Sequence, residues 1–214
     1  MEIDGKEIKR STNVKFLGVI IDEYLDWNLQ VKSVLNKLSI GNYSLNMTRN
    51  VLPSHSKRLL YLSHIQSHLN YALSSWGSMI SQTCLRKVKV AQNKAIRAIF
   101  NLSKRTSLAK YYRKANVMMV EDLIKLSLLK ISFRYINDLL PQRISNLFEI
   151  NRHERHTRNR YNLTTPQHTL QIYNNSFLGR APNCWLMLAN DIKQKTSSKS
   201  FSKSFLKSVI VNYS

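Results

Sequence analysis

Three carboxylates near the N-terminus are the first residues whose types and spacing could support chemistry. Asp22, Glu23 and Asp26 follow a run of β-forming residues. Paired carboxylates at the end of a strand could bind Mg²⁺, as nucleotidyl-transfer sites require. Asp26, however, also suits the cap of a following helix, and the other two acids suit solvent-exposed positions. The cluster therefore favours a structural role over a metal site.

A second candidate pair consists of His64 and His68, which lie four residues apart on a predicted helix and could share a zinc ion. The sequence has no Glu between them in the HExxH arrangement and no third ligand that supports such a site, so structural histidines are favoured. It also contains no nucleophile motif, no GxxxxGK(S/T) and no GxGxxG. We therefore predict no catalytic residue, no metal site, no cofactor and no small-molecule substrate.

The strongest signal is positive charge. The chain has 33 Lys and Arg against 12 Asp and Glu, a formal net charge of +21. No Asp or Glu occurs between Asp26 and Glu121, although Lys and Arg occur throughout this interval. Such a block repels itself unless counterions or phosphates neutralise it. The balance indicates an anionic partner, most often nucleic acid and less often an acidic membrane surface or acidic protein; a solvated basic surface is the alternative.

The elements that must position these cations centre on residues 54–100, which predict two helices joined near residues 75–77. Gly77 can end the first helix in a left-handed conformation. A hairpin with one apolar seam and one cationic side is suited to clamp backbone phosphates. Apolar residues at three- and four-residue steps form the seam: Leu59, Leu62, Ile65, Leu69 and Leu73 in the first helix, and Leu85, Val88, Ala91, Ala95 and Ile99 in the second.

The remaining elements predict a mainly α fold. Residues 2–8 and 14–21 predict two short strands with a turn at 9–13, and Gly18 marks a bulge or a close backbone approach. Two strands are too few for an independent sheet, so they either pack onto the helices or belong to a sheet whose remainder is missing. Further predicted elements are helices at 28–48, 108–115, 120–138, 185–192 and 197–212, a loop at 151–168 and a short strand at 169–173.

The composition also bears on the cellular compartment. The two cysteines, Cys84 and Cys184, lie too far apart for a zinc motif or a disulfide framework, which favours a reducing compartment. No 18-residue apolar run occurs and the N-terminus lacks a signal-peptide apolar region. We expect an intracellular, nuclear protein that does not enter a membrane.

The order of several short motifs resembles one family. Residues 14–22 (VKFLGVIID) followed by 25–27 (LDW) are similar to the segment after the catalytic core of non-LTR (LINE-type, jockey- or CR1-like) retrotransposon reverse transcriptases. In those enzymes this segment forms the primer-grip strand and the entry to the helical thumb. The similarity extends over nearly the whole chain: residues 67–71 (SHLNY), 75–77 (SWG), 92–97 (QNKAIR), 156–161 (HTRNRY), 181–185 (APNCW) and 201–206.

The resemblance implies a divided architecture. Residues 1–25 would be the end of the palm, with Phe16, Leu17 and Gly18 in the primer-grip position. Residues 26–149 would form the helical thumb, and residues 150–214 a basic loop with C-terminal helices. The family's (F/Y)ADD motif lies upstream of the primer grip and is absent from this sequence. Mg²⁺ would belong to the missing catalytic core, so we expect this chain alone to be inactive.

The implied partner is an RNA or DNA template–primer duplex, held through its phosphates with little sequence readout. Three tyrosines flanked by basic residues, Tyr111, Tyr112 and Tyr161, are candidates for base stacking. Core packing is expected instead for Tyr61, Tyr71, Trp76 and Tyr135. The predicted nucleic-acid-binding residues are Arg86, Lys87, Lys94, Arg97, Lys104, Arg105, Arg158 and Arg160.

Three other readings remain open from the sequence. The chain could be a thumb retained by a host as a stand-alone nucleic-acid-binding protein. It could be a helical adaptor whose basic face docks an acidic protein partner. It could also be a nonfunctional remnant.

Overall fold

The computed structural model describes residues 2–3, 6–7, 10–147, 163 and 169–213. Within these residues the chain is mainly helical with short N-terminal strands, which confirms the predicted fold class. The strands are β1 (Glu2–Ile3), β2 (Lys6–Glu7), β3 (Asn13–Phe16) and β4 (Val19–Asp22). The helices are α1 (Asn28–Met47), α2 (Ser54–Tyr61), the π-helical turn η1 (Leu62–Gln66), α3 (Ser67–Asn70), α4 (Leu73–Trp76), α5 (Gln82–Phe100), α6 (Ala109–Ala115), α7 (Val120–Ile136), α8 (Gln142–Ser145), α9 (Gln171–Asn175), α10 (Phe177–Leu186), α11 (Asn190–Lys193) and α12 (Ser198–Val211).

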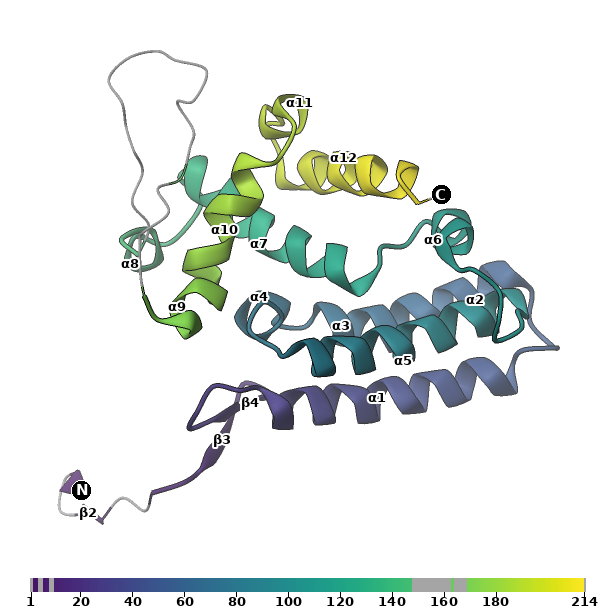
Figure 1. The fold of residues 1–214 in the computed structure, drawn as a ribbon, viewed down its shortest axis with the longest axis horizontal. Coiled ribbons are helices and arrows are strands. Elements are labelled where there is room, and N and C mark those ends of the chain that lie inside the picture. The colour runs from purple at the N-terminus through teal and green to yellow at the C-terminus, as the bar shows by residue number, and fades with distance from the viewer. Residues whose placement is uncertain (1, 4–5, 8–9, 148–162, 164–168, 214) are drawn as a thin grey trace.

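The helices form layers (Figure 1). Helix α1 lies along one side and packs against α5 and the π-helical turn η1. Helices α2, η1 and α3 run on as one rod beside α5 and make the middle layer. Helix α7 lies on the other side of this layer and is covered by α10 and α12. The basic stretch of the sequence therefore occupies the lower and middle layers of the bundle.

The strand predicted over residues 14–21 is instead a complete hairpin. Strands β3 and β4 pair in antiparallel register, with Phe16 opposite Val19. The turn between them is formed by Leu17 and Gly18, both at positive φ (45° and 81°). Two successive residues with positive φ define the tight turn that matches the twist of a hairpin. Gly18 is thus a turn residue and not a bulge.

The β3–β4 hairpin packs onto the helices, which is one of the two arrangements expected for the N-terminal strands. Val19 is buried, and the backbone N–H of Ile20 donates to Oε1 of Gln30 at 3.0 Å. Gln30 belongs to α1 and is itself buried. A helix side chain therefore occupies the position that a further strand would take at this point of the β4 edge.

The two central helices confirm the predicted hairpin, but the first of them ends earlier than predicted. The first rod ends at Asn70, and Ala72 adopts a left-handed conformation with φ of 48° before the short helix α4. Gly77 is right-handed (φ −64°), so its predicted left-handed role is wrong. A Cβ at Gly77 would lie 2.7 Å from the Leu73 carbonyl oxygen and 3.1 Å from Ile124, which means that close packing against α7 requires the glycine.

The apolar seam of the hairpin forms largely as predicted. Ile65, Leu69 and Leu73 are buried in the first helix segments, whereas Leu59 is 51% exposed and lies outside the seam. In α5 the buried residues include Val88, Ala95, Ile96 and Ile99. Gln92 is also buried in this helix, although it is polar. A polar side chain in the core must find hydrogen-bond partners there.

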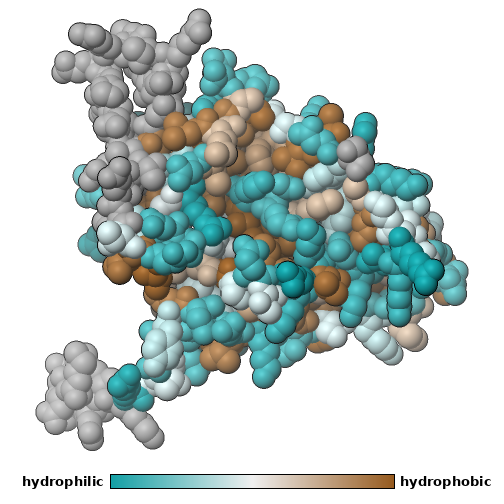
Figure 2. Space-filling view, in the orientation of Figure 1, coloured by the Kyte–Doolittle hydropathy of each residue, from teal (hydrophilic) through white to brown (hydrophobic). Residues whose placement is uncertain are grey.

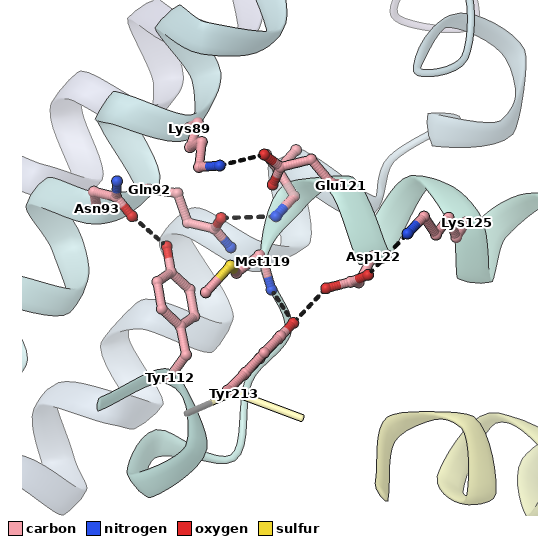
Figure 3. Close-up of polar contacts among 10 residues, drawn as sticks. Lys89, Gln92, Asn93, Tyr112, Met119, Glu121, Asp122, Lys125 and Tyr213 are labelled. Atoms are coloured by element: carbon pink, nitrogen blue, oxygen red, sulfur yellow. Dashed lines mark hydrogen bonds and ion pairs between the residues drawn. The ribbon is translucent and has the colours of Figure 1, made fainter. Parts of the chain in front are cut away.

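Gln92 joins α5 to the start of α7 (Figure 3). Its Oε1 accepts from the Val120 backbone N–H at 2.9 Å. Its Nε2 donates to the Met118 carbonyl oxygen at 2.9 Å and to the Tyr61 hydroxyl at 2.8 Å. The first N–H groups of a helix have no partner within the helix. Gln92 therefore supplies, from another helix, a cap that α7 lacks in its own sequence.

The C-terminal residues complete the same cap. The Tyr213 hydroxyl donates to Oδ2 of Asp122 at 2.6 Å and accepts from the Met119 backbone N–H at 3.0 Å (Figure 3). Burial and the hydrogen bond to Asp122 raise the pKa of Tyr213 above its ordinary value. Tyr213, just after α12, is thus fixed at the N-terminus of α7.

The C-terminal region shares its core with the helices of residues 26–149. Helices α10 and α12 contact α7, and Trp185 and Phe201 stack with 5.9 Å between ring centroids. Phe201 also lies 4.7 Å, centroid to centroid, from Phe133 of α7. With α3, α4 and α5 packed against its other sides, α7 is buried on most of its circumference, as its apolar composition predicts.

Two predictions for this region are wrong. The strand expected at 169–173 is wrong, because the short helix α9 begins at Gln171. The loop predicted at 151–168 lies outside the described residues, except for the buried Leu163. The helix predicted at 185–192 is also wrong: α10 ends at Leu186, a separate short helix, α11, begins at Asn190, and Pro182 lies inside α10. A proline costs a helix one hydrogen bond, and burial of Pro182 and Trp185 against the rest of the bundle offsets that loss.

The cap formed by Gln92 generates a prediction. Gln92→Leu leaves the Val120 N–H and the Met118 carbonyl buried without partners. We expect the free energy of unfolding to fall by about 3 kcal/mol. Urea denaturation followed by circular dichroism measures this change. The matched control is Gln82→Leu at an exposed position of the same helix, expected to change stability by less than about 0.5 kcal/mol; equal losses in both variants would contradict the capping role.

Candidate nucleic-acid interface

The outward face of α5 carries the predicted cations. Arg86, Lys87 and Lys94 are exposed, and Lys87 and Lys94 are two helical turns apart on the same side. Lys89 points toward α7 instead, where its Nζ lies 2.6 Å from Oε1 of Glu121. Lys89 is therefore neutralised by a carboxylate, whereas Arg86, Lys87 and Lys94 face solvent.

The cationic row continues into the loop that follows α5. Nη2 of Arg97 donates to the Lys104 carbonyl oxygen at 3.2 Å, so the last turn of the helix fixes the loop. Asn101 ends the helix in a left-handed conformation with φ of 53°. The side chains of Lys104 and Arg105 are exposed. The structure thus brings together six of the eight residues predicted to bind nucleic acid.

Two further cations hold the same loop and were missed by the sequence reasoning. Nη2 of Arg49 donates to the Leu102 carbonyl oxygen at 3.4 Å. The buried Lys57 donates to Oδ1 of Asn101 at 3.1 Å and to the Arg49 carbonyl oxygen at 2.9 Å. Burial and the nearby charge of Arg49 lower the pKa of Lys57. No local pattern marks these residues, because their role depends on a contact with a loop more than 40 residues away.

We call Arg86, Lys87, Lys94, Arg97, Lys104 and Arg105 the α5 strip. Figure 2 shows hydrophilic side chains spread over the face on which Figure 1 draws α5. The sequence between residues 27 and 120 contains no carboxylate that could neutralise the strip locally. Arg158 and Arg160, the other two predicted contacts, lie outside the described residues.

The predicted primer-grip residues form the tip of the β3–β4 hairpin. Phe16 and Leu17 are 62% and 75% exposed. The Tyr71 hydroxyl donates to the Leu17 carbonyl oxygen, and the Tyr71 ring lies beside Gly18. Tyr71 is half-exposed, so its predicted place in the core is wrong. The tip therefore presents apolar and aromatic side chains to solvent at a position fixed by Tyr71.

The tip and the beginning of the α5 strip lie at the same end of the bundle. Strand β4 leads directly into α1, and the start of α1 contacts the start of α5 through Sγ of Cys84 and Oδ1 of Asn28, 3.1 Å apart. The far end of the strip lies near α6 (Figure 1). The apolar tip and the cationic strip could consequently contact one extended ligand.

The N-terminal carboxylates have structural partners. Asp22 is buried and accepts backbone N–H groups from Tyr24 and Asp26 at Oδ1 and from Trp27 at Oδ2, at 3.0–3.2 Å. Asp26 accepts the Asn28 N–H at 2.8 Å, and Glu23 pairs with Arg10 at 2.8 Å. Burial would raise the pKa of Asp22, but these N–H donors outweigh it and lower the pKa.

The histidine pair and the cysteines do not form a metal site in the described part of the chain. No group of three or more His, Cys, Asp or Glu side chains that could hold a metal ion occurs among those residues. Nδ1 of His64 lies 2.8 Å from the Ser63 hydroxyl. Partial burial and the charges of Lys37 and His64 lower the pKa of His68.

The aromatic candidates divide between core and surface. Tyr61, Trp76 and Tyr135 are buried, as predicted. Tyr112 is also buried, and its hydroxyl donates to Oδ1 of Asn93 at 2.8 Å (Figure 3), so it cannot stack on a base as predicted. Tyr111 is half-buried against Phe100 with 5.2 Å between ring centroids. Tyr161 lies outside the described residues.

No protein-family model, curated protein or solved structure matches this chain. The resemblance to reverse transcriptases therefore stays a prediction from the sequence motifs. Among the described residues, no helix is both long and apolar enough to cross a membrane.

The carboxylate of Asp22 generates a pH-dependent prediction. Its lowered pKa means that the folded state stabilises the charged carboxylate. This stabilisation is present above the pKa of the carboxyl in the unfolded chain, about 3.9, and is lost as the pH falls through its pKa in the folded protein. We expect Asp22→Asn to lower the free energy of unfolding by about 2 kcal/mol at neutral pH.

The experiment compares denaturation of wild type and Asp22→Asn at pH 7 and pH 3. The difference between them should shrink at the lower pH, because the carboxyl group of the unfolded wild-type chain becomes protonated there and must lose its proton on folding. Glu23→Gln removes only an exposed ion pair and should cost less than about 1 kcal/mol. A wild-type advantage of the same size at both pH values would show that the charge of Asp22 does not matter.

Proposed function

We propose that this chain binds template–primer nucleic acid without sequence preference, through phosphate contacts with the α5 strip. The observation that carries the proposal is the row of exposed, unneutralised cations on a rigid helix that runs into a loop held by Arg49, Lys57 and Arg97. Phosphate contacts dominate the affinity of such proteins for nucleic acid, and they require fixed cations more than base-reading side chains.

The dimensions of the strip suit a duplex. From Arg86 to Arg97, the last strip residue on α5, the helix advances about 16 Å at 1.5 Å per residue. At 3.4 Å per base pair this corresponds to roughly five base pairs of a duplex lying along the helix. Lys104 and Arg105 would extend the contact beyond the end of α5. A surface of this length favours backbone tracking over recognition of a single phosphate.

The hairpin tip has a separate role in this proposal. Phe16, Leu17 and Gly18 stand where the resemblance places the primer grip, and in an intact polymerase they would brace the primer end. The exposed Phe16 and Leu17 side chains could pack against the sugar or base at the end of a strand. The chain supplies no catalytic aspartates in this reading, so the proposal is binding and not polymerisation.

The test is the salt dependence of binding to labelled RNA–DNA hybrid, duplex DNA and single strands. The variant Lys87→Gln/Lys94→Gln removes two exposed cations from the strip. We expect weaker binding to every duplex sequence and a decrease of about 2 in the slope of log affinity against log salt. Fluorescence anisotropy from low to physiological salt measures both quantities.

The matched control is Lys199→Gln/Lys203→Gln, which removes the same charge from exposed positions of α12. Because α12 lies in another layer, this variant should keep the wild-type slope. Equal affinity and equal slope for wild type and the Lys87/Lys94 variant would exclude the α5 strip as the binding surface. Absence of binding at low salt would reject the function itself.

A further inference from the structure

Helix α1 has a second apolar face that the bundle does not use. Val31, Val34, Leu38 and Leu45 are buried against the other helices. On the opposite side Leu29 is 40% exposed, and three apolar or aromatic side chains nearer the C-terminal end of α1 are more exposed. Ile40, Tyr43 and Met47 are 66%, 66% and 65% exposed. We call Leu29, Ile40, Tyr43 and Met47 the α1 stripe.

The spacing of the stripe indicates the shape of what would cover it. Ile40, Tyr43 and Met47 follow steps of three and four residues, and Leu29 lies two heptads before Tyr43, with the polar Ser33 and Asn36 at the two positions between Leu29 and Ile40. This is the pattern of a coiled-coil seam, which is one helix wide. A helix with apolar residues on both faces is normally buried on both faces. The stripe therefore fits a single additional helix.

The charges beside the stripe indicate the chemistry of that helix. Lys32 and Lys37 flank the seam on its two sides and are exposed. Residues 28–47 contain no Asp or Glu. In coiled coils the flanking positions choose the partner by charge, so Lys on this helix selects Glu or Asp on the other. We infer that the α1 stripe docks an acidic amphipathic helix of a partner protein.

Other occupants fit the same surface less well. A second copy of the chain would offer Lys32 and Lys37 a helix that has no Asp or Glu, and each copy carries a net charge of +21. A lipid surface favours a broad apolar face, whereas the α1 stripe is only one side chain wide. An acidic helix alone satisfies both the width and the flanking charge. The inference does not depend on nucleic-acid binding by α5.

The experiment uses designed helical peptides of about four heptads as probes. One peptide has Leu at the seam positions and Glu beside them, and a second has the same composition in scrambled order. We expect the periodic peptide to bind the full chain at least tenfold more tightly than the scrambled peptide, measured by fluorescence anisotropy at physiological salt. The triple variant Ile40→Ser/Tyr43→Ser/Met47→Ser should lose this advantage.

Two controls separate the stripe from general surface properties. Leu59→Ser/Val90→Ser removes exposed apolar side chains from other helices and should leave peptide binding unchanged. Lys32→Glu/Lys37→Glu should weaken binding of the Glu peptide and strengthen binding of a peptide with Lys at the same flanking positions. Thermal unfolding of each variant checks that these exposed substitutions leave the fold intact.

Three results would overturn the inference. Equal binding of the periodic and scrambled peptides would show that net charge alone attracts them. Sedimentation with phosphatidylserine vesicles that is lost in the triple variant would assign the stripe to a membrane. Dimerisation of the unmodified chain that is lost in the triple variant would assign it to a second copy. Failure of nucleic-acid binding would leave the inference standing, because the α5 strip lies on another helix.

Discussion

The structure depends on how a chain with few carboxylates fixes its Lys and Arg side chains in position. Around the loop after α5, backbone and amide oxygens accept hydrogen bonds from Arg49, Lys57 and Arg97. Such oxygens orient a cation but do not neutralise its charge. The loop is consequently fixed in place by groups that stay positive, and it carries Lys104 and Arg105 into solvent beside them. Structural rigidity and positive potential come from the same contacts.

The carboxylates that the sequence does provide are used where backbone N–H groups need acceptors or helices need negative charge. Asp22 accepts three N–H groups before α1. Glu121 and Asp122 occupy the first turn of α7, where carboxylates favour the helix dipole. Only Lys89 of the α5 cations reaches one of them. These three carboxylates therefore lie at helix starts, and Arg86, Lys87 and Lys94 of α5 have no ion-pair partner among the described residues.

Periodicity was sufficient to predict the long helices, because α1, α5 and α7 each bury side chains at helical spacing. It failed at the reversals. Leu17 and Ala72 adopt positive φ of 45° and 48°, which their side chains disfavour, so no local rule selects them as turn residues. The exposed half of the α5 strip was visible in the sequence as a run of cations. Lys57 was not, because its burial arises only when α2, α1 and the loop after α5 come together.

The α5 strip and the α1 stripe place two kinds of surface on one pair of packed helices. Asn42 of α1 donates to the Ala91 carbonyl oxygen of α5 at 3.1 Å, on the side of α1 that faces away from the stripe. A helix is about 10 Å across, which equals the screening length at 0.1 M salt. An acidic helix on the stripe would therefore lower the potential at the strip more in dilute buffer than at physiological salt. The two proposed partners would contact different helices, so any competition between them would act through charge and weaken as salt is added.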